Sequence, residues 1–519
     1  MCKNGGTCRQ MGPAAVSCIC APGYTGDLCE SQIAAPECGI EECAEVCKIG
    51  TACDCNPKDT DVSLARFETR LQVVDQPSEN ISKEIIDQLT SYLKTSNIVL
   101  EDEIEILNIS SVEANGARTA WLRMWGSRRS AGALRAALAR LAATTRMRTD
   151  RLRLLPDTLH FEMHPALNLH TLVVNQRPEV WEGSEFILTC MAYGSPNIAF
   201  TWYKDGVKIN FNGTTRDIWT RTVSEDALGR RMSVLGISEA NRPDSGKWSC
   251  AADDAGRRRC RALRLTVLRP PDIRLVPSTL TVNKGDNVSI TCLAGAGRVH
   301  GALGFSWARE RTLLPMAPGR EVWEDLYPAG SVLKLYNVQK SSEFRCQVSS
   351  VAGTNAKAVT MWALGADDEA CESDASHGLR WPKTAPGAHA SASCPPGHSG
   401  ETTRFCEPKT GQHGVKWMLP DFSGCVADSL KDIYEQFTLI SYGYSWGLVS
   451  HVSRQYGAVL RSLPTHPGEG EPPLTHALHM LHYLRSAAAR PPDRYHSAEH
   501  LLNIYDHLLK HPDAFLDEE

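Results

Sequence analysis

The sequence contains no window of about 18 consecutive apolar residues, the length that a helix needs to cross a membrane. It also lacks a charged start followed by an apolar run, so we recognise no signal peptide in it. Lys and Arg number 55 and Asp and Glu number 60, with both signs interspersed, which gives a formal net charge of -5. This balance gives no reason to expect nucleic acid as a partner.

Cysteine is the most informative residue type that is present, with 19 copies. The cysteines cluster in the first 55 residues and then recur in widely spaced pairs, which is typical of an oxidising compartment. Four sequons point the same way, and these glycosylation candidates are Asn80, Asn108, Asn212 and Asn287. A chain of 519 residues with 42% apolar content predicts about three to five domains.

Cysteines and tryptophans follow a distinctive order near the C-terminal part of the chain, namely Cys371, Trp381, Cys394, Cys406, Trp417 and Cys425. A module of about 55 residues buries too little apolar surface to fold alone, so two disulfides and a Trp pair must hold it together. The order resembles the hormone-receptor domain in the ectodomains of adhesion G-protein-coupled receptors. The module pattern favours Cys371 with Cys425 and Cys394 with Cys406, although four cysteines allow three connectivities.

The first 29 residues carry five cysteines, spaced as Cys2-x5-Cys8-x9-Cys18-x-Cys20-x8-Cys29. This spacing resembles the last five cysteines of an epidermal-growth-factor-like (EGF-like) module. The resemblance implies disulfides from Cys2 to Cys18 and from Cys20 to Cys29, and it leaves Cys8 without its partner. We therefore expect Met1 to be an internal methionine or a misassigned start, and the natural chain to begin upstream.

Five further cysteines repeat the first positions of the same pattern without an obvious sixth, namely Cys38, Cys43, Cys47, Cys53 and Cys55. A zinc site is disfavoured because Cys53-x-Cys55 is too closely spaced for the usual ligand pair, so we expect disulfides. Calcium is also not expected, since no Asp, Asn or Glu cluster precedes the visible cysteines.

Residues 64–172 contain no cysteine and must rely on their own core. Hydrophobic periodicity predicts strands near 67–74, 104–106, 122–124 and 159–163 and helices near 81–93 and 134–141. The resulting order, βαββαβ, is a ferredoxin-like α+β arrangement. In this position it resembles a SEA domain, and the turn at 110–116 lacks the residues for SEA self-cleavage, which predicts an uncleaved spacer.

Two segments have the pattern of immunoglobulin-like (Ig-like) sandwiches, in which a buried Trp packs on an inter-sheet disulfide. The first has Cys190, Trp202 and Cys250, and the second has Cys292, Trp307 and Cys346, which predicts the disulfides Cys190–Cys250 and Cys292–Cys346. At the tyrosine corner, two residues before the second cysteine, stand Trp248 and Phe344, so the rigidity of that corner is in question. Cys260 has no partner within its own domain, and we favour a buried free thiol over an intermolecular bridge.

The sequence beyond Cys425 is helical and rich in His. One predicted amphipathic helix carries Leu430, Ile433, Tyr434 and Phe437, and a second carries Leu501, Leu502, Tyr505, Leu508 and Leu509. The prolines of 464–473 and 491–492 are interpreted as breaks between helices. By position this segment resembles the helical first half of a GAIN domain, and the β-rich second half with its autoproteolysis motif is not reached by residue 519.

Two His motifs raise the alternative of a metal site. His496, Glu499 and His500 match an H-x-x-E-H zinc motif, but Ser497 suits a helix N-cap, which would place His496 outside the helix. His476, His479 and His482 are predicted to face away from Leu474, Leu478 and Leu481 as a solvated stripe. We therefore expect no catalytic or metal-binding residues and no cofactor.

These patterns predict a multi-domain chain with disulfide-rich EGF-like modules, a ferredoxin-like SEA domain, two all-β sandwiches, a small hormone-receptor domain and an α-helical end. The expected ranges are 1–30 (truncated EGF-like), 31–60 (degenerate EGF-like), 64–172 (SEA-like), 173–269 and 270–364 (Ig-like), 369–426 (hormone-receptor) and 427–519 (helical, GAIN-like and truncated).

The resemblances imply the ectodomain of an adhesion G-protein-coupled receptor of the Ig-Hepta-like subgroup, without enzymatic activity. Its expected partner is an extracellular protein or glycan, and it would contact a membrane only through a region beyond residue 519. The first alternative is a secreted matrix or decoy protein with the same modules, and the second is a zinc hydrolase using His496, Glu499 and His500.

Overall fold

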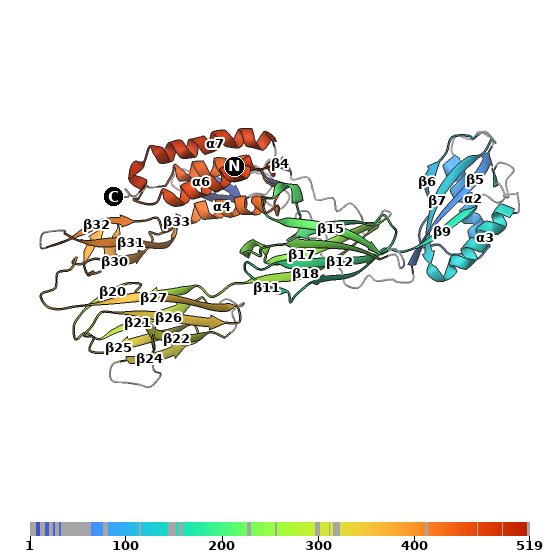
Figure 1. The fold of residues 1–519 in the computed structure, drawn as a ribbon. Helices are drawn as coiled ribbons and strands as arrows, with labels where there is room; N and C mark the ends of the chain where they lie inside the picture. The colour runs from blue at the N-terminus through green and yellow to red at the C-terminus, as the bar shows by residue number, and fades with distance from the viewer. Residues whose placement is uncertain are drawn as a thin grey trace.

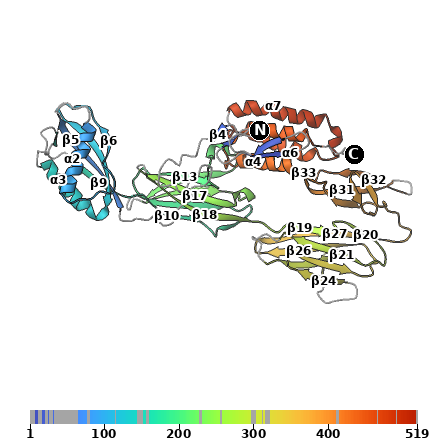
Figure 2. The ribbon, with the colours of Figure 1, turned by 180° about the vertical axis from the view of Figure 1, so that it is seen from behind.

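The structure of the chain is a computed structural model, shown as a ribbon in Figure 1 and from behind in Figure 2. It describes residues 7–10, 16–19, 24–25, 31–32 and 64–515, except for gaps at 76–80, 114–115, 144–151, 155–158, 226–229, 255–256, 296–301, 311, 315–321, 410–413, 464–465 and 490. An α+β module lies at one end of the molecule, and a β-sandwich joins it to the other modules. The second sandwich, a small disulfide module and a helical module complete the chain, and the helical module returns to the first sandwich.

The N-terminal part contributes four short strands in two hairpins. They are β1 (Thr7–Gln10), β2 (Val16–Ile19), β3 (Tyr24–Thr25) and β4 (Ser31–Gln32). Strand β1 pairs antiparallel with β2, and β3 pairs with β4. The disulfides expected among Cys2, Cys18, Cys20 and Cys29, and the cysteines at 38–55, concern side chains outside the described residues.

The α+β module has one antiparallel sheet and two helices that share one core. Its elements are β5 (Leu64–Asp75), α2 (Ile81–Thr95), β6 (Glu105–Ile109), β7 (Arg118–Ser127), α3 (Ala131–Ala143), β8 (Leu152–Leu154) and β9 (His160–Pro165). The sheet order is β6-β7-β5, with β8 and β9 both paired to β5, so the module has the predicted ferredoxin-like order. Strand β8 was not predicted.

The first sandwich packs a four-stranded sheet against a five-stranded one. The first sheet contains β10 (Asn168–Val174), β12 (Phe186–Tyr193), β16 (Arg230–Ile237) and β15 (Ile218–Glu225). The second contains β11 (Glu179–Trp181), β18 (Arg257–Leu268), β17 (Gly246–Asp254), β13 (Ala199–Lys204) and β14 (Val207–Lys208). The predicted boundary at 172/173 falls inside β10, because Leu167 and Leu169 are already buried in the sandwich core.

The second sandwich has the same arrangement of four and five strands. Its first sheet contains β19 (Ile273–Val276), β21 (Val288–Ala294), β25 (Gly330–Leu335) and β24 (Val322–Tyr327). Its second sheet contains β20 (Leu280–Asn283), β27 (Gly353–Leu364), β26 (Ser342–Ser350), β22 (Gly304–Arg309) and β23 (Thr312–Leu313).

The cores of both sandwiches are built around a tryptophan, a disulfide and a buried serine. Cys190 is bonded to Cys250, and Cys292 to Cys346, so both expected pairs are present. The indole nitrogen of Trp202 donates to Ser233 Oγ at 2.9 Å, and that of Trp307 donates to Ser331 Oγ at 2.8 Å. Because a buried indole N–H needs an acceptor, the serine on the facing sheet fixes the orientation of each tryptophan.

The small disulfide module contains β28 (Asp374–Ser376), β29 (Leu379–Trp381), β30 (His389–Ser393), β31 (His398–Pro408), β32 (Val415–Asp421) and β33 (Cys425–Ala427). The guanidinium of Arg404 lies between two rings, 5.7 Å from the centroid of Trp381 and 4.9 Å from that of Trp417. This cation–π stack, together with the disulfides, takes the place of a large core.

The predicted connectivity of this module is wrong. The disulfides are Cys371–Cys406 and Cys394–Cys425, so the two pairs interleave, whereas nested pairs were favoured. Strand register explains the difference. Strands β31 and β33 place Gly400 opposite Cys425, and the Cys394 amide donates to the Gly400 carbonyl, so Cys394 and Cys425 lie beside each other. Gly400 adopts a φ of +120°, and a Cβ there would lie 2.0 Å from the Gly424 carbonyl oxygen, so this crossing requires glycine.

The helical module is formed by α4 (Asp428–Ser441), α5 (Val449–Leu460), α6 (Glu471–Arg485) and α7 (Pro491–Leu509). The predicted apolar face of α4 is buried at Leu430, Ile433 and Phe437. The prediction for α7 is right in part, because Leu501 and Leu508 are buried together with Ile504. Leu502 and Leu509 are exposed. Pro472, Pro473 and Pro491 lie in the first turns of α6 and α7. The helices are interrupted between Leu460 and Glu471 and between Arg485 and Pro491, as the prolines predicted, and the prolines at the helix starts are tolerated because an N-terminal turn can lack an N–H.

We predict that non-reducing peptide mapping of the folded protein will recover Cys371 linked to Cys406 and Cys394 linked to Cys425. Paired Cys371→Ser and Cys406→Ser changes should destabilise this module by about 2 to 5 kcal/mol, because the unfolded chain loses its constraint. The same changes should leave the Cys190–Cys250 linkage intact. Recovery of a Cys371–Cys425 peptide would contradict the register described above.

Candidate functional site

The H-x-x-E-H motif of the zinc alternative lies entirely within α7, which begins at Pro491. Ser497 is fully buried inside this helix, so its assignment as an N-cap is wrong, and His496 lies within the helix. Asp493, one turn before Ser497, accepts hydrogen bonds from the amides of Val449 and Ser450, both at 2.9 Å. This carboxylate caps the start of α5, which gives that end of α7 a structural role. Among the described residues, no three potential metal ligands lie together.

The predicted solvated His stripe of α6 is confirmed for His479 and His482, which are exposed, but is wrong for His476 and for the leucines it was expected to oppose. The buried face of α6 carries Ala477, Met480 and Leu484, while Leu478 and Leu481 are exposed. His476 stacks on Tyr434 with ring centroids 3.7 Å apart, and its Nδ1 lies 2.9 Å from the hydroxyl of Tyr456. Burial, assisted by the nearby His479, lowers the pKa of His476 to about 4. His476 is therefore a neutral packing residue near physiological pH.

Three of the four sequons lie within the described residues, and each asparagine is exposed. Asn108 is on the edge strand β6, Asn287 precedes β21, and Asn212 is in the 3-10 turn Phe211–Gly213. Asn80 falls in the gap at 76–80. The Asn212 sequon adjoins the contact between the first sandwich and the helical module, because the Gly213 carbonyl accepts from the hydroxyl of Tyr483 at 3.0 Å.

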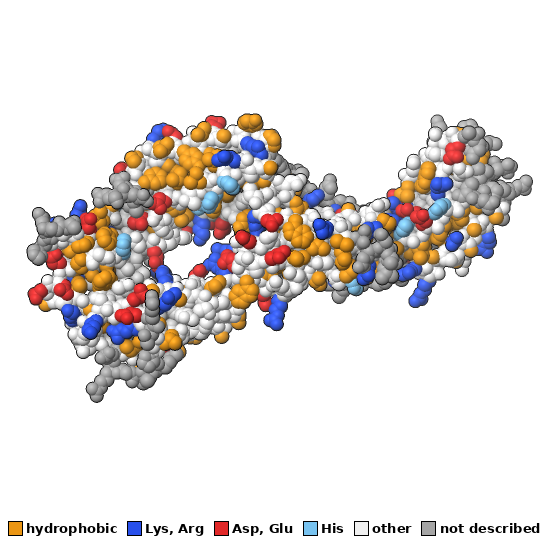
Figure 3. Space-filling view, in the orientation of Figure 1, with side chains coloured by type: hydrophobic (Ala, Val, Ile, Leu, Met, Phe, Trp, Pro, Cys, Tyr) orange, Lys and Arg blue, Asp and Glu red, His pale blue; other side chains and the backbone are white. Residues whose placement is uncertain are grey.

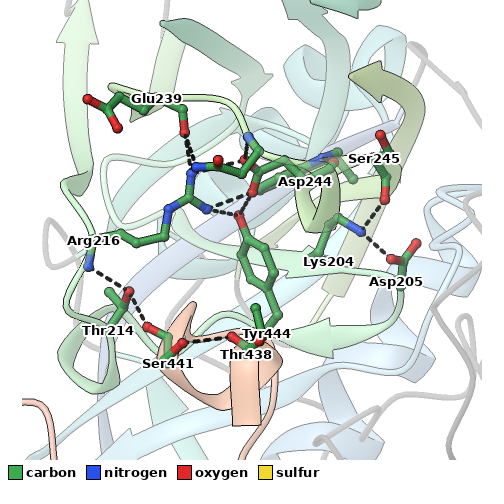
Figure 4. A network of polar contacts seen from close by, with 12 residues as sticks. Lys204, Asp205, Thr214, Arg216, Glu239, Asp244, Ser245, Thr438, Ser441 and Tyr444 are labelled. Atoms are coloured by element: carbon green, nitrogen blue, oxygen red, sulfur yellow. Dashed lines mark hydrogen bonds and ion pairs between the residues drawn. The ribbon is translucent and has the colours of Figure 1, made fainter. Parts of the chain in front are cut away.

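The most elaborate polar arrangement in the described chain is centred on Asp244, a fully buried residue of the first sandwich (Figure 4). Its carboxylate accepts from Arg216 Nη1 at 2.8 Å and from Nη2 at 3.0 Å, a bidentate pair. The Asn241 amide donates to it at 2.7 Å, and the hydroxyl of Tyr444 donates to its Oδ1. Tyr444 comes from the helical module, 200 residues later in the chain.

Tyr444 is buried in the core of the first sandwich, although it follows α4 of the helical module. Its ring meets that of Trp248 edge to face at 5.7 Å, and Lys204 Nζ lies 5.7 Å from its centroid. Burial, followed by the negative charge of Asp244, holds the pKa of Tyr444 well above its ordinary value. The phenol therefore keeps its proton and serves as a donor to the carboxylate.

Backbone contacts reinforce this connection, which we call the 441–446 joint after the segment Ser441–Trp446. The Gly443 carbonyl accepts from the Asn210 amide at 2.8 Å, and Trp446 Nε1 donates to the Lys208 carbonyl at 2.7 Å. Gly443 has a φ of +76°, and a Cβ there would lie 2.6 Å from the Asn210 oxygen. The backbones can approach this closely only because residue 443 is glycine.

Trp248 supplies the hydrogen bond that a tyrosine corner would normally provide. Its Nε1 donates to the Asp244 carbonyl, four residues upstream, at 2.9 Å. The first corner is therefore tied down, and the indole replaces the hydroxyl that the sequence lacks. In the second sandwich, Phe344 is fully buried and lies 5.6 Å from the guanidinium of Arg309. Cys260 is half-buried on β18, opposite Ala251.

A buried ion pair connects the α+β module to the first sandwich. Arg66 Nη1 of β5 lies 2.9 Å from Asp254 Oδ1 of β17, and only 6% and 3% of the two side chains are exposed. Asp254 also accepts from the Ser195 amide at 2.8 Å and from its hydroxyl at 2.6 Å. Because both charges are removed from water, each needs compensation, which the pair supplies together with Glu68, 3.4 Å from Arg66 Nε, and the Ser195 donors.

Comparison with known proteins identifies two of the modules. Residues 171–253 match the immunoglobulin domain model and residues 2–28 the EGF-like domain model. Mouse hemicentin-1 is 27% identical over 172 residues, which cover 33% of this chain and 3% of hemicentin-1. Rat protein turtle homolog B is 29% identical over 156 residues, 29% of this chain and 11% of that protein. The chain thus spans a small part of the length of these relatives.

Solved structures match part of this chain at low overall similarity. An I-band fragment of titin, I67–I69, covers 46% of this chain and 80% of its own length, with 15% identity and a TM-score of 0.27. The chain contains Ig-like and EGF-like domains, which are typical of extracellular and cell-surface proteins. Within the described residues, no helix is both long enough and apolar enough to span a membrane.

We predict that Tyr444→Phe will loosen the 441–446 joint, because Asp244 loses a donor that it cannot replace from solvent. The expected cost is about 1 to 3 kcal/mol, measured by denaturant unfolding, with faster hydrogen exchange at the Asn210 amide. Tyr495→Phe is the matched control, since Tyr495 is 80% exposed on α7. Equal stability of the two variants would contradict the role assigned to Tyr444.

Replacing Arg66 with Met should destabilise the contact between the α+β module and the first sandwich by about 3 kcal/mol, because the Asp254 charge stays buried without its partner. Calorimetry of the whole chain measures this effect. Lys510→Met, which breaks the exposed Lys510–Asp506 pair, should cost less than about 0.5 kcal/mol. A similar cost for both changes would show that the buried pair is not important for stability.

The low pKa of His476 predicts that the helical module weakens in acid. An unfolded histidine titrates near pH 6.5 and folded His476 near 4, so the unfolded chain takes up the proton first as the pH falls. The stability that His476 contributes is complete above about pH 6.5 and is lost toward pH 4. In His476→Gln, the free energy of unfolding should depend less on pH in this window than it does in the unmodified chain. His482→Gln, a change at an exposed position, should leave the pH dependence unaltered.

Proposed function

We propose that this chain is the extracellular recognition and adhesion region of an adhesion G-protein-coupled receptor. In this proposal the α+β module is a SEA domain, the small disulfide module is a hormone-receptor domain, and the helical module is the first half of a GAIN domain. The two sandwiches present loops to an extracellular protein or glycan, because rigid β-scaffolds carry variable connections at their ends. The chain performs no chemistry of its own.

The observation that carries the proposal is the continuity between the small disulfide module and the helical module. Strand β33 ends at Ala427 and α4 begins at Asp428, whose amide donates to the Gly397 carbonyl at 2.9 Å. The Phe422 ring stacks on His466 at 4.8 Å, and the Phe422 amide donates to the Pro467 carbonyl at 2.8 Å. A disulfide module fused to a helical module in this way supports a hormone-receptor domain leading into a GAIN domain.

A buried histidine–carboxylate contact further strengthens this fusion. His398 Nε2 lies 2.7 Å from Glu469 Oε1, and only 7% and 12% of the two side chains are exposed. Glu469 also accepts from the His466 amide at 3.0 Å. Close contacts at this junction support a direct connection between the two modules.

Sequencing the transcript beyond the codon for Glu519 tests the receptor assignment. The proposal expects a β-rich segment with a His–Leu–Thr or His–Leu–Ser type cleavage motif, followed by seven apolar spans. A stop codon directly after residue 519, with secretion of the soluble chain, would instead support a matrix or decoy protein. Stoichiometric zinc that disappears in His500→Ala would favour the hydrolase alternative.

The recognition function can be tested with the recombinant chain itself. We expect an Fc-fused chain to bind a subset of cell types or immobilised glycans, and binding should survive the His500→Ala change. Treatment of the cells with trypsin and with glycosidases would separate protein from glycan partners. Loss of all cell binding at micromolar concentrations would contradict a role in recognition.

A further inference from the structure

The second sandwich exposes three aromatic rings at one edge of its four-stranded sheet. Trp323 and Tyr327 of the edge strand β24 are 45% and 57% exposed, and Tyr336, directly after β25, is 41% exposed. We call these three residues the aromatic face. Figure 3 shows hydrophobic side chains together with acidic and basic ones over the second sandwich, in the part of the molecule where Figure 1 labels β24 and β25.

A polar pair between the rings fixes this surface. Asp325 Oδ1 accepts from the indole nitrogen of Trp323 at 2.7 Å, and Lys334 Nζ lies 2.7 Å from Asp325 Oδ2. The hydrogen bond to Asp325 is the main cause that raises the pKa of Lys334. The hydroxyls of Tyr336 and Tyr327 raise this pKa further, so both rings lie on the same side of the sheet as the polar pair.

A glycosylation candidate adjoins the aromatic face. Asn287 directly precedes β21, and its sequon continues through Val288 to Ser289 in that strand. Val288 pairs with Leu335, so Asn287 comes opposite Tyr336 beside the neighbouring strand. Val288 packs on the sandwich core, and side chains alternate along a strand. Asn287 and Ser289 therefore face outward, on the same side as the aromatic face, and both are exposed.

The side chain of Asn287 is held in one orientation. Its Oδ1 accepts from the backbone amide of Asn337 at 2.9 Å. An N-linked glycan is attached to the amide nitrogen Nδ2 and leaves Oδ1 as an acceptor, so this hydrogen bond persists in a glycosylated chain. The first sugar therefore starts from a fixed point beside Tyr336.

Sheet spacing sets the distances from Asn287 to the rings. Tyr336 follows the adjacent strand, so its backbone lies about 5 Å away. Trp323 pairs with Lys334 and lies two strands and two residues from Asn287, which corresponds to roughly 12 Å. A glycan that runs across the sheet thus reaches Tyr336 with its first sugar and Trp323 with the sugars that follow. Between the rings, Asp325 and Lys334 offer an acceptor and a donor for sugar hydroxyls.

The small disulfide module approaches the opposite edge of the same sheet. The strand order is β19-β21-β25-β24, and Arg274 of β19 donates to Ser393 Oγ of that module at 3.3 Å. Strand β24 is the far edge, which both ribbon views place at the outside of the molecule (Figure 1, Figure 2). A glycan that starts at Asn287 therefore extends over β25 and β24 and away from the neighbouring module.

We propose that the N-linked glycan on Asn287 packs over the aromatic face and covers it. A pyranose ring presents C–H groups that stack on the negative face of an aromatic ring, and its hydroxyls bind polar groups. The aromatic face and its polar pair supply both kinds of partner, and the glycan shields apolar surface that would otherwise be open to association. The inference rests on the extracellular part of the proposed function, since N-glycans are added to secreted chains. It does not depend on the receptor assignment.

Site-specific glycopeptide mass spectrometry of the chain secreted from animal cells tests the proposal. Asn287 should be occupied, and an excess of its glycans should stay oligomannose, because a glycan held against the protein is shielded from processing enzymes. Trp323→Thr combined with Tyr336→Thr should abolish this excess. Both residues are exposed, so folding should be preserved, which circular dichroism checks. Tyr495→Thr, which removes an aromatic ring that is 80% exposed on α7, is the control and should leave the excess unchanged.

Hydrogen exchange measures the same contact from the side of the protein. Ser289→Ala removes the glycan but keeps Asn287 and its hydrogen bond to Asn337. This change should speed exchange of the β24 and β25 amides about two- to tenfold, the range that corresponds to one aromatic contact. In the double Thr variant, Ser289→Ala should have no further effect, because the rings that hold the glycan are already gone.

Three results would overturn the proposal and leave the proposed function intact. The first is an unoccupied Asn287 in a chain that is glycosylated at another sequon. The second is equal glycan processing, or an equal effect of Ser289→Ala, with and without the aromatic rings. The third is an external protein that binds the aromatic face of the fully glycosylated chain. A secreted chain with no occupied sequon would contradict this inference, whereas a chain that cannot be secreted at all would contradict the extracellular assignment itself.

Discussion

The buried carboxylate of Asp244 organises the centre of this molecule. A buried carboxylate must be compensated by hydrogen-bond donors. Here the donors are Arg216, the backbone amide of Asn241 and the hydroxyl of Tyr444. Because Tyr444 belongs to the helical module, satisfying this one carboxylate requires the end of the chain to return to the first sandwich. The arrangement of the later modules depends on this constraint.

Asp244 also fixes the tyrosine-corner position of the first sandwich through its backbone carbonyl. The Asp244 carbonyl accepts from the Trp248 indole, and the Trp248 ring packs against Tyr444. The core of the sandwich and its contact with the helical module therefore share side chains. A change that destabilises one of them should also destabilise the other. For an extracellular region built to bind partners, this couples the sandwich to the segment that leads toward the C-terminus.

Contacts to two other modules hold the first sandwich in place. Arg66 and Asp254 hold the α+β module at one end, and the 441–446 joint holds the helical module at the other.

The sequence by itself determined the modules and much of their internal structure. Period-two and helical patterns located the elements of the α+β module, and the Cys–Trp–Cys spacing located both sandwiches, because these signals arise from local geometry and a single buried contact. Tertiary structure alone decided the pairing in the small disulfide module, where the register of β33 with β31 places Cys425 beside Cys394. It also decided the face of α6, where Ala477, Met480 and Leu484 pack inward while Leu478 and Leu481 are exposed. The contact between Tyr444 and Asp244 joins residues 200 positions apart, and no local pattern encodes which buried charge a distant hydroxyl will meet.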